Sequence, residues 1–262
     1  MPIFVRFFTM QQPLNSKKLS GQVWRMEIDE STDILCAEIR NVADKKVSFA
    51  SIDLNTGETY FDDLTTGERW MAGLEAVHDG ILLLHHYQPG DMPVHKGITA
   101  VDVKTGRVLW ENYNYAFEYL SVNGPVASDM RIQPGKLFLI DITNGQYLRK
   151  HDAIIDTEMP KSIFVPDLVP AEELRDVLQG VDIYGNIAHR YQYNNYRIVS
   201  LHALYSGQLQ QHLFIFENDV DKPVFEDLLN GGIQKMQPEA FVLYKDRLLW
   251  IKEKTEIKLL KL

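Results

Sequence analysis

The chain has 262 residues, of which 45% are hydrophobic and 24% charged, and these ordinary globular values exclude a disordered tail. Its formal net charge of −9 repels phosphate backbones, and no cluster of Lys and Arg offsets that charge, so we expect no nucleic-acid partner. The single cysteine, Cys36, excludes an internal disulfide and a multi-cysteine metal site, and its apolar neighbours predict a small buried side chain.

The first predicted strand covers residues 3–8, and the polar residues 11–20 after it predict a connector. We expect residues 3–8 to pair with a strand from 240–262, because a closed ring of sheets leaves no unpaired edge. Residues 1–10 lack the basic region and cleavage site of a signal peptide. No run approaches the ~18 apolar residues of a membrane-spanning helix. The sequence therefore predicts a cytoplasmic protein with no membrane partner.

One pattern then repeats three times. An apolar–Asp alternation is followed four positions later by Gly, and a second apolar run begins after it. The Asp side chain can cap the N–H groups of a turn, and Gly can take a positive φ. Each copy thus predicts a β-hairpin with a left-handed glycine. The Asp–Gly pairs are Asp53–Gly57, Asp102–Gly106 and Asp141–Gly145, and Gly207 ends a weaker fourth copy.

The spacing of these glycines indicates the fold. Successive intervals are 106 − 57 = 49, 145 − 106 = 39 and 207 − 145 = 62 residues, and periods of ~40–50 are typical of four-stranded propeller blades. Further strands are predicted at 22–28, 33–40, 81–87, 136–141, 193–204, 208–216, 240–244, 247–252 and 256–262. The sequence therefore predicts an all-β fold, a small β-propeller of about five four-stranded antiparallel blades, with residues 1–262 as a single domain.

Two short helices interrupt the predicted strands. Residues 170–180 begin with Pro170, carry acidic residues early and end at Gly180, which is the pattern of a helix. A helical turn is also predicted from 222 to 229, before a run of Asn and two Gly. Both helices lie after the third copy of the repeat.

The second copy of the repeat resembles a known motif. The spacing of Ala100, Asp102, Thr105, Gly106 and Trp110 resembles the tryptophan-docking motif of quinoprotein-type β-propellers, which are related in architecture to the WD type. The resemblance implies that the Trp packs on the neighbouring blade while Asp and Thr-Gly shape the turn. The Trp position holds Phe61 in the first copy, Arg149 in the third and Gln211 in the fourth.

The resemblance covers about half the chain and concerns architecture alone. Quinone-dependent dehydrogenases of that family are rings of about twice this length and commonly carry a vicinal cysteine pair, so their activity and cofactor do not carry over. In overall pattern the chain also resembles a family of uncharacterised bacterial proteins of similar length, a domain of unknown function.

Four histidines, His78, His85, His86 and His95, surround the second hairpin. His85 and His86 are neighbours on a strand, so their side chains point to opposite faces and cannot both bind one ion without a bulge. The pattern favours one buried, hydrogen-bonded imidazole and one exposed imidazole over a metal site. We therefore predict no metal-binding residue.

Carboxylates offer no clear catalytic pair. The three local pairs suit turns and helix starts, and the aspartates of the repeat are explained by turn capping. No nucleophile elbow, phosphate-binding loop, dinucleotide fingerprint or calcium loop occurs. We predict no catalytic residue, no cofactor-binding residue and no cofactor. The local pairs are Asp62-Asp63, Glu172-Glu173 and Glu226-Asp227.

Aromatic side chains form the most suggestive functional feature. The first run alternates along a predicted strand, so its rings share one face. Packing between blades is the favoured interpretation, and a surface that binds sugars, peptides or proteins is the alternative. The two runs are Tyr113, Tyr115, Phe117 and Tyr119, and then Tyr184, Tyr191, Tyr193 and Tyr196.

Two functions stay open on this sequence. The favoured one is a non-enzymatic module that binds a protein or a small-molecule ligand, because repeats occur without catalytic motifs. The alternative is a hydrolase or lyase that acts on a small or carbohydrate ligand in the central channel. The residues that would bind the ligand or partner are not identified by the sequence.

Overall fold

The computed structural model describes residues 15–88, 94–174, 178, 181–218, 220 and 222–262. Nearly all regular structure in these residues is β-strand. The chain contacts divide it into two compact units. The central unit comprises residues 19–161, and the terminal unit comprises residues 1–18 with 162–262.

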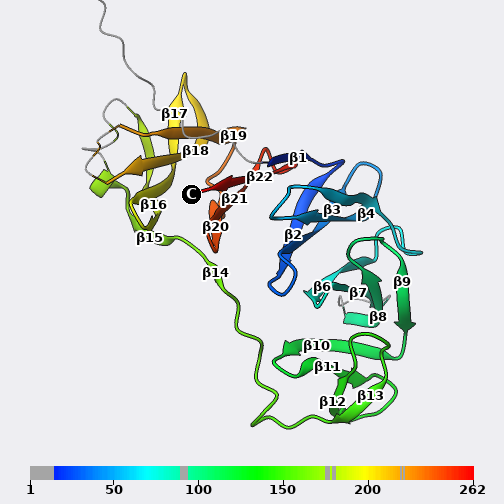
Figure 1. The fold of residues 1–262 in the computed structure, drawn as a ribbon. Coiled ribbons are helices and arrows are strands. Elements are labelled where there is room, and N and C mark those ends of the chain that lie inside the picture. The colour runs from blue at the N-terminus through cyan, green and yellow to red at the C-terminus, as the bar shows by residue number, and fades with distance from the viewer. Residues whose placement is uncertain (1–14, 89–93, 175–177, 179–180, 219, 221) are drawn as a thin grey trace, which may run out of the picture. The chain divides into compact units, whose positions relative to one another are not determined.

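The central unit consists of three antiparallel sheets of four strands, each with its strands in sequence order (Figure 1). The first sheet contains β2 (Gln22–Asp29), β3 (Ile34–Asn41), β4 (Lys46–Asp53) and β5 (Thr59–Leu64). The second contains β6 (Ala72–His78), β7 (Ile81–Gln88), β8 (Val94–Asp102) and β9 (Val108–Asn112). The third contains β10 (Tyr115–Ser121), β11 (Gly124–Asp129), β12 (Leu137–Ile140) and β13 (Tyr147–Lys150).

The repeated hairpins have the predicted geometry and join the last two strands of each central sheet. In each, the glycine N–H donates to the carbonyl of the Asp four residues earlier, at 2.8–2.9 Å. The Asp carboxylate caps the turn, as where Asp102 accepts from the Thr105 N–H at 2.7 Å. Gly57, Gly106 and Gly145 have φ of 75°, 68° and 71°. The prediction of left-handed glycines is confirmed.

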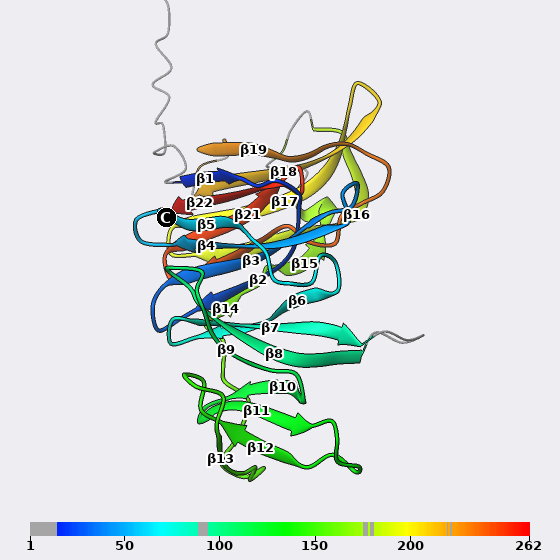
Figure 2. The same cartoon turned by 90° about the vertical axis from the view of Figure 1, so that its right-hand side faces the viewer.

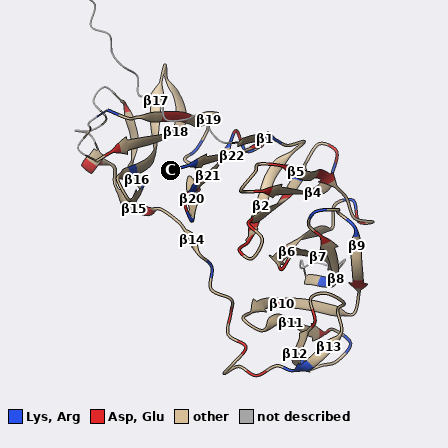
Figure 3. Ribbon diagram, viewed as in Figure 1, with Lys and Arg blue, Asp and Glu red and all other residues tan. Residues whose placement is uncertain are grey.

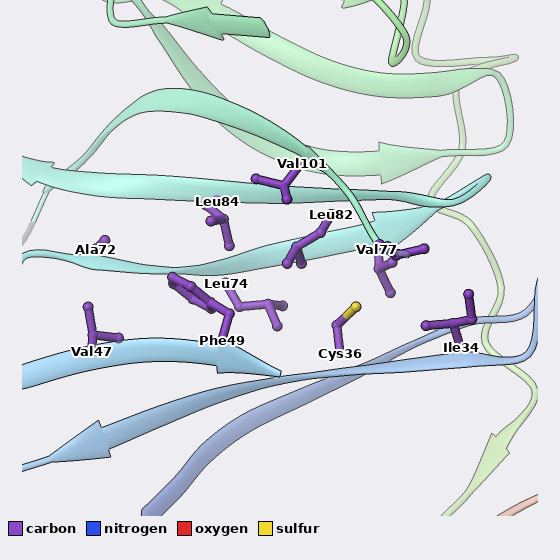
Figure 4. Packing of buried hydrophobic residues seen from close by; sticks show 11 residues of the cluster. Ile34, Cys36, Val47, Phe49, Ala72, Leu74, Val77, Leu82, Leu84 and Val101 are labelled. Atoms are coloured by element: carbon purple, nitrogen blue, oxygen red, sulfur yellow. The ribbon is translucent and has the colours of Figure 1, made fainter. Parts of the chain in front are cut away.

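Apolar side chains fill the space between the first two central sheets. Phe49 and Cys36 from the first sheet and Leu74, Leu82 and Leu84 from the second are all fully buried in one cluster. Figure 4 shows these side chains pointing toward one another. Burial raises the pKa of the Cys36 thiol, which agrees with its predicted role as a small apolar side chain.

The first and second central sheets each contact the next sheet through the residue at the tryptophan position. The ring of Trp110 lies against Gly145, where an added Cβ would be 2.6 Å from the ring, and its Nε1–H donates to the Ile142 carbonyl at 2.8 Å. Phe61 lies in the same way against Gly106, 3.4 Å from an added Cβ. The hairpin glycine therefore serves two purposes, because it permits a positive φ and leaves room for a ring from the preceding sheet.

The terminal unit contains two antiparallel sheets of five strands (Figure 2). One has the order β1 (Asn15–Lys18), β22 (Glu256–Lys261), β21 (Arg247–Lys252), β20 (Phe241–Tyr244) and β14 (Ile163–Phe164). The other runs in sequence order through β15 (Asp167–Pro170), β16 (Ile183–Tyr193), β17 (Tyr196–Tyr205), β18 (Gln208–Glu217) and β19 (Phe225–Ile233). A buried apolar cluster that includes Ile198, Leu213 and Trp250 joins the two sheets.

The start of the described chain pairs with its end. Asn15 lies opposite Leu259 and Lys18 opposite Glu256. The predicted connector at residues 11–20 is thus wrong for residues 15–18, which form a strand because β22 offers them an open edge. The predicted pairing of residues 3–8 lies outside the described residues.

Two predicted helices require correction. Of residues 170–180, Pro170 ends β15 and Ala171–Leu174 form a single 3-10 turn, while residues 175–177, 179 and 180 lie outside the described residues. Leu174 of this turn and Leu178 after it pack on the β15–β18 strands. The predicted turn at 222–229 is wrong, because Phe225–Ile233 form strand β19. Leu and acidic residues favour a helix locally, but pairing with β18 decides the structure of this segment.

The fourth copy of the repeat is a different hairpin. Ser206 and Gly207 form a two-residue turn between Tyr205 and Gln208, and both have positive φ, 51° and 77°. This is the geometry of a type I′ turn. It needs no aspartate cap, which explains why Ala203 replaces the Asp of the other copies.

The five antiparallel sheets, several of them four-stranded, confirm the all-β fold class and fit the blades of a β-propeller. The extent of a single domain over 1–262 stays a prediction. No helix among the described residues is long and apolar enough to cross a membrane.

Candidate functional site

Three neighbouring strands of the second central sheet bring a carboxylate and two histidines together. Glu75 lies on β6, His85 on β7 and His95 on β8. Each offers one atom that can bind a metal, and these atoms lie within 4.8 Å of one another. Glu75 Oε1 is 2.7 Å from His95 Nδ1 and 3.0 Å from His85 Nδ1. We call these residues the Glu–His–His cluster.

The two imidazole rings of this cluster are stacked. Their centroids are 3.6 Å apart and their planes differ by 9°. The Tyr87 ring meets both edge-on, with centroids at 4.7 and 5.2 Å. His85 is 2% exposed and Glu75 is 7% exposed, whereas the His95 side chain is 39% exposed. The cluster therefore has a buried floor and one accessible histidine.

Hydrogen bonding within the cluster is incomplete. His95 Nδ1 shares a hydrogen bond with Glu75 Oε1. His85 Nδ1 lies close to the same oxygen, but neither ring nitrogen of His85 has a hydrogen-bond partner. The distance of 3.0 Å is short enough for a hydrogen bond, so the bond is absent because the oxygen does not lie in the direction in which the ring nitrogen could donate. A buried polar nitrogen without a partner costs stability, and packing alone does not explain its presence.

Irregular strand pairing aims these side chains. Glu75 lies where the β6–β7 register shifts, and His85 lies where the β7–β8 register shifts. Such bulges turn a side chain away from the regular alternation and are frequent next to binding sites. Gly73 lies opposite His85, and an added Cβ there would be 2.6 Å from the His85 ring. Glycine at position 73 thus leaves space for the imidazole.

A buried ion pair from the first sheet adjoins the Glu–His–His cluster. Arg40 Nε is 2.6 Å from Glu38 Oε1, and Glu38 Oε2 accepts from the Leu74 N–H at 2.9 Å. The Arg40 guanidinium lies over the rings of Trp24 and Trp70, 5.4 and 4.9 Å from their centroids. Arg40 is therefore fixed by one carboxylate and two aromatic faces.

Exposed and partly exposed side chains adjoin these buried groups. Trp24 is 64% exposed and lies at a register shift of β2 against β3. The side chain of Arg25 is 40% exposed, pairs with Glu27 at 3.0 Å and donates to the Glu75 carbonyl at 2.9 Å. Burial raises the pKa of Tyr87. We call the whole set the polar–aromatic cluster: Trp24, Arg25, Glu38, Arg40, Trp70, Glu75, His85, Tyr87 and His95.

The other predicted histidines lie outside this cluster. His86 Nε2 is 3.1 Å from the Thr99 hydroxyl, which donates to Glu111, and burial lowers the pKa of His86. The expectation that one of His85 and His86 is exposed is wrong, because both are buried. His78 lies at the end of β6, 3.4 Å from Asp79.

Most side chains of the two aromatic runs pack against the hydrophobic core, which is the interpretation that the sequence favoured. Tyr115 and Phe117 pack between the second and third central sheets, and the Tyr119 hydroxyl donates to the Asp156 carbonyl at 2.8 Å. In the second run, Tyr191, Tyr193 and Tyr196 pack on the core of the terminal unit. Tyr113 and Tyr184 are the exposed members, at 54% and 45%.

The predicted carboxylate pairs have separate structural partners. Asp63 pairs with Lys46 at 2.6 Å, and Glu173 pairs with Arg190 at 3.1 Å. Asp227 accepts from Trp250 Nε1 at 3.0 Å. The structure brings none of these three described pairs together with another, so they form no joint site among the described residues.

The sequence match falls on the part of the chain that carries this cluster. Residues 28–110 match DUF4905, a domain of unknown function. The matched segment includes Glu38, Arg40, Glu75, His85 and His95. It supports the predicted resemblance to a domain of unknown function, and leaves the quinoprotein or WD type open. No curated protein matches the chain.

Three solved structures align with the chain at low similarity. Raptor from Chaetomium thermophilum aligns at 10% identity and a TM-score of 0.36, over 96% of this chain and 28% of that one. An endo-arabinase from Bacteroides thetaiotaomicron aligns at 12% identity and 0.27, over 97% of each chain. The Dos1 propeller aligns at 10% identity and 0.26, over 95% of each chain. This chain spans 28% of the length of Raptor, and TM-scores this low carry no conclusion about function.

Proposed function

We propose that the protein is a non-enzymatic binding module and that the polar–aromatic cluster binds a small carbohydrate. The observation that carries the proposal is the concentration of Glu38, Arg40, Glu75 and His85 in one place, all buried within strands of the central unit. Other buried aspartates of this unit have a local structural role, as where Asp156 accepts the Asp152 N–H at 2.8 Å.

Such a group of buried charges does not stabilise a fold efficiently. Replacing a buried ion pair by apolar side chains is often neutral or stabilising, and His85 has unpartnered nitrogens in addition. Sequences depart from good packing mainly at functional sites. The cost in stability therefore favours a role in binding for this cluster.

The exposed side chains of the cluster favour a sugar as the ligand. Trp24 exposes much of its indole, and an exposed aromatic face can stack on the apolar face of a sugar ring. The Trp24 ring contacts Arg40 of the cluster, and Arg25, Tyr87 and His95 contribute polar atoms to the same cluster that can donate to or accept from hydroxyl groups. Aromatic surface with a few placed polar groups is typical of ligand sites.

The hydrolase alternative has less support. Catalysis on a glycoside needs two carboxyl groups that face the scissile bond. Both oxygens of Glu38 already accept hydrogen bonds, from Arg40 and from the Leu74 N–H. Glu75 is then the only carboxylate of the cluster whose side chain contacts the accessible His95, so binding is the function we favour.

Two further proposals concern the type of repeat and the location. The docking of Trp110 on Gly145 supports a repeat of the quinoprotein type in the central unit. The single cysteine, Cys36, is a free, buried thiol, which suits a reducing compartment, and we propose a cytoplasmic location.

The test is binding of defined sugars to the purified chain in EDTA. Cellotetraose, xylotetraose and trigalacturonic acid are titrated by calorimetry. We expect at least one to bind, and Trp24→Ala to weaken its binding at least tenfold with little change in melting temperature, since Trp24 is largely exposed. Tyr147→Ala is the matched control, because Tyr147 is 56% exposed in the same unit and lies on β13. Absence of binding by all three sugars, or equal losses in the two variants, would overturn the proposal.

A further inference from the structure

We propose that the Glu–His–His cluster binds one divalent transition-metal ion, with Zn²⁺ as the ion that fits its ligands best. This inference goes beyond sugar binding and does not depend on it. Two imidazoles and one carboxylate are a common ligand set for Zn²⁺ and related ions, which leaves further positions for water or a ligand.

The first observation is the convergence of three ligand atoms from three strands. Glu75, His85 and His95 each place one such atom within 4.8 Å of the other two. Ligands at ~2.0–2.1 Å from Zn²⁺ in a tetrahedral site are separated by ~3.3 Å. The Oε1–Nδ1 distances of 2.7 and 3.0 Å therefore need to widen by only about half an ångström.

The second observation is the unsatisfied hydrogen bonding of His85. Its exposed fraction is only 2%, and neither of its buried ring nitrogens has a hydrogen-bond partner. A metal ion on Nδ1 would give this nitrogen the partner it lacks. Close contact of its ring with Gly73 on β6 holds the imidazole in place, as a ligand must be held.

Charge around the cluster favours a cation. Arg40 is paired with Glu38, and Arg25 is paired with Glu27, which also pairs with Lys161. The two nearby guanidinium groups thus each have a carboxylate partner other than Glu75. Glu75 shares its Oε1 only with the two histidines among the described contacts, so its charge is available to an ion.

One side chain has to move for the ion to bind. Stacked rings with planes 9° apart direct their nitrogen lone pairs along nearly parallel planes, which do not meet at one point. His85 is confined by Gly73, so His95 has to tilt out of the stack. Its side chain is 39% exposed and near the start of β8, which leaves space for that rotation.

The experiment titrates ZnCl₂ into the full chain after dialysis against EDTA and then against metal-free buffer, with no sugar present. We expect one Zn²⁺ per chain and a rise in melting temperature. We also expect Co²⁺ to give visible d–d absorption bands. His95→Gln removes an accessible ligand with little risk to folding and should weaken Zn²⁺ binding at least 100-fold. Glu75→Gln should do the same if it folds.

His78→Gln is the matched control, because His78 lies on the same hairpin beside Asp79 and outside the cluster. It should leave Zn²⁺ affinity unchanged. Failure of the wild-type chain to take up one Zn²⁺, or an equal loss of affinity in His78→Gln and His95→Gln, would overturn the metal site. Because the sugar titration contains EDTA and the metal titration contains no sugar, either proposal can fail without the other.

Discussion

Replacing Trp110 by alanine tests how one sheet of the central unit is fastened to the next. The variant removes a ring that lies on Gly145 and an N–H that donates to the Ile142 carbonyl at 2.8 Å. Trp-to-Ala changes in cores cost about 3–5 kcal/mol, and Trp110 is only partly buried. We therefore expect about 3 kcal/mol, of which about 1 kcal/mol is the lost hydrogen bond.

Thermal and urea unfolding measure this cost. For a chain of this size about 3 kcal/mol corresponds to a fall in melting temperature of about 6–12 °C. Trp110→Phe keeps part of the ring but loses the N–H donor, so its cost should lie between those of wild type and Trp110→Ala. An unchanged melting curve for Trp110→Ala would show that the indole contributes nothing at this position.

A double-mutant cycle separates docking from other effects of the substitution. An alanine Cβ at Gly145 would be 2.6 Å from the Trp110 ring, and Gly145 also has a positive φ of 71°. Gly80→Ala is the control, because Gly80 has φ of 76° and nothing within 4 Å of an added Cβ. In the wild-type background, Gly145→Ala should lower the free energy of unfolding by more than Gly80→Ala does. In the Trp110→Ala background, the two glycine substitutions should lower it by about the same amount. Equal costs of Gly145→Ala in both backgrounds would refute direct contact.

Two more predictions concern the terminal unit. Burial lowers the pKa of His202 from 6.5 to about 4. The unfolded chain therefore binds a proton at this histidine at a higher pH than the folded chain does. The free energy of unfolding should fall as the pH drops from about 6.5 toward 4. In the His202→Gln variant, the glutamine can still accept the hydrogen bond that the Gln237 N–H now donates to Nε2 at 2.9 Å. The variant should therefore fold but show a weaker pH dependence of unfolding; an unchanged dependence of stability on pH would contradict the assignment. Removing residues 1–18 deletes β1 and leaves β22 as an open edge. The melting temperature should then be lower than that of a chain that lacks only residues 1–10, and equal melting temperatures would show that the pairing of β1 adds no stability.

The sequence predicted the hairpins of the central unit because their chemistry is local. An Asp and a Gly four residues apart specify a capped turn with one left-handed residue, and Asp102 with Gly106 shows this geometry. Strand β6 was missed for the opposite reason. It contains Ala72, Gly73 and Glu75, which are residue types depleted in strands. Gly73 and Glu75 both lie against His85 on the neighbouring strand, and a sequence pattern within β6 alone does not reveal this contact.

The Glu–His–His cluster was not predicted because it depends on the register between strands, which a single sequence does not reveal. Adjacent histidines on β7 suggested two opposite faces and no shared ion. The partner of His85 is instead His95, which reaches it from β8 across a register shift. A bulge of one residue changes which side chains meet. A prediction that assumes regular alternation of side chains along each strand therefore could not find this site.

The structure also explains why the residue at the tryptophan position differs between copies of the repeat. Phe61 and Trp110 each place a ring on the hairpin glycine of the following sheet. Arg149 holds the same position in the third sheet, and its Nη1 donates instead to Asp156 at 2.7 Å. Asp156 is 1% exposed and also accepts the Asn123 amide at 3.0 Å, and the Arg149 contact lowers the pKa of its carboxyl. At this position the third copy of the repeat therefore has an ion pair with a residue that follows β13, in place of a ring on a hairpin glycine, and this ion pair stabilises the end of the central unit.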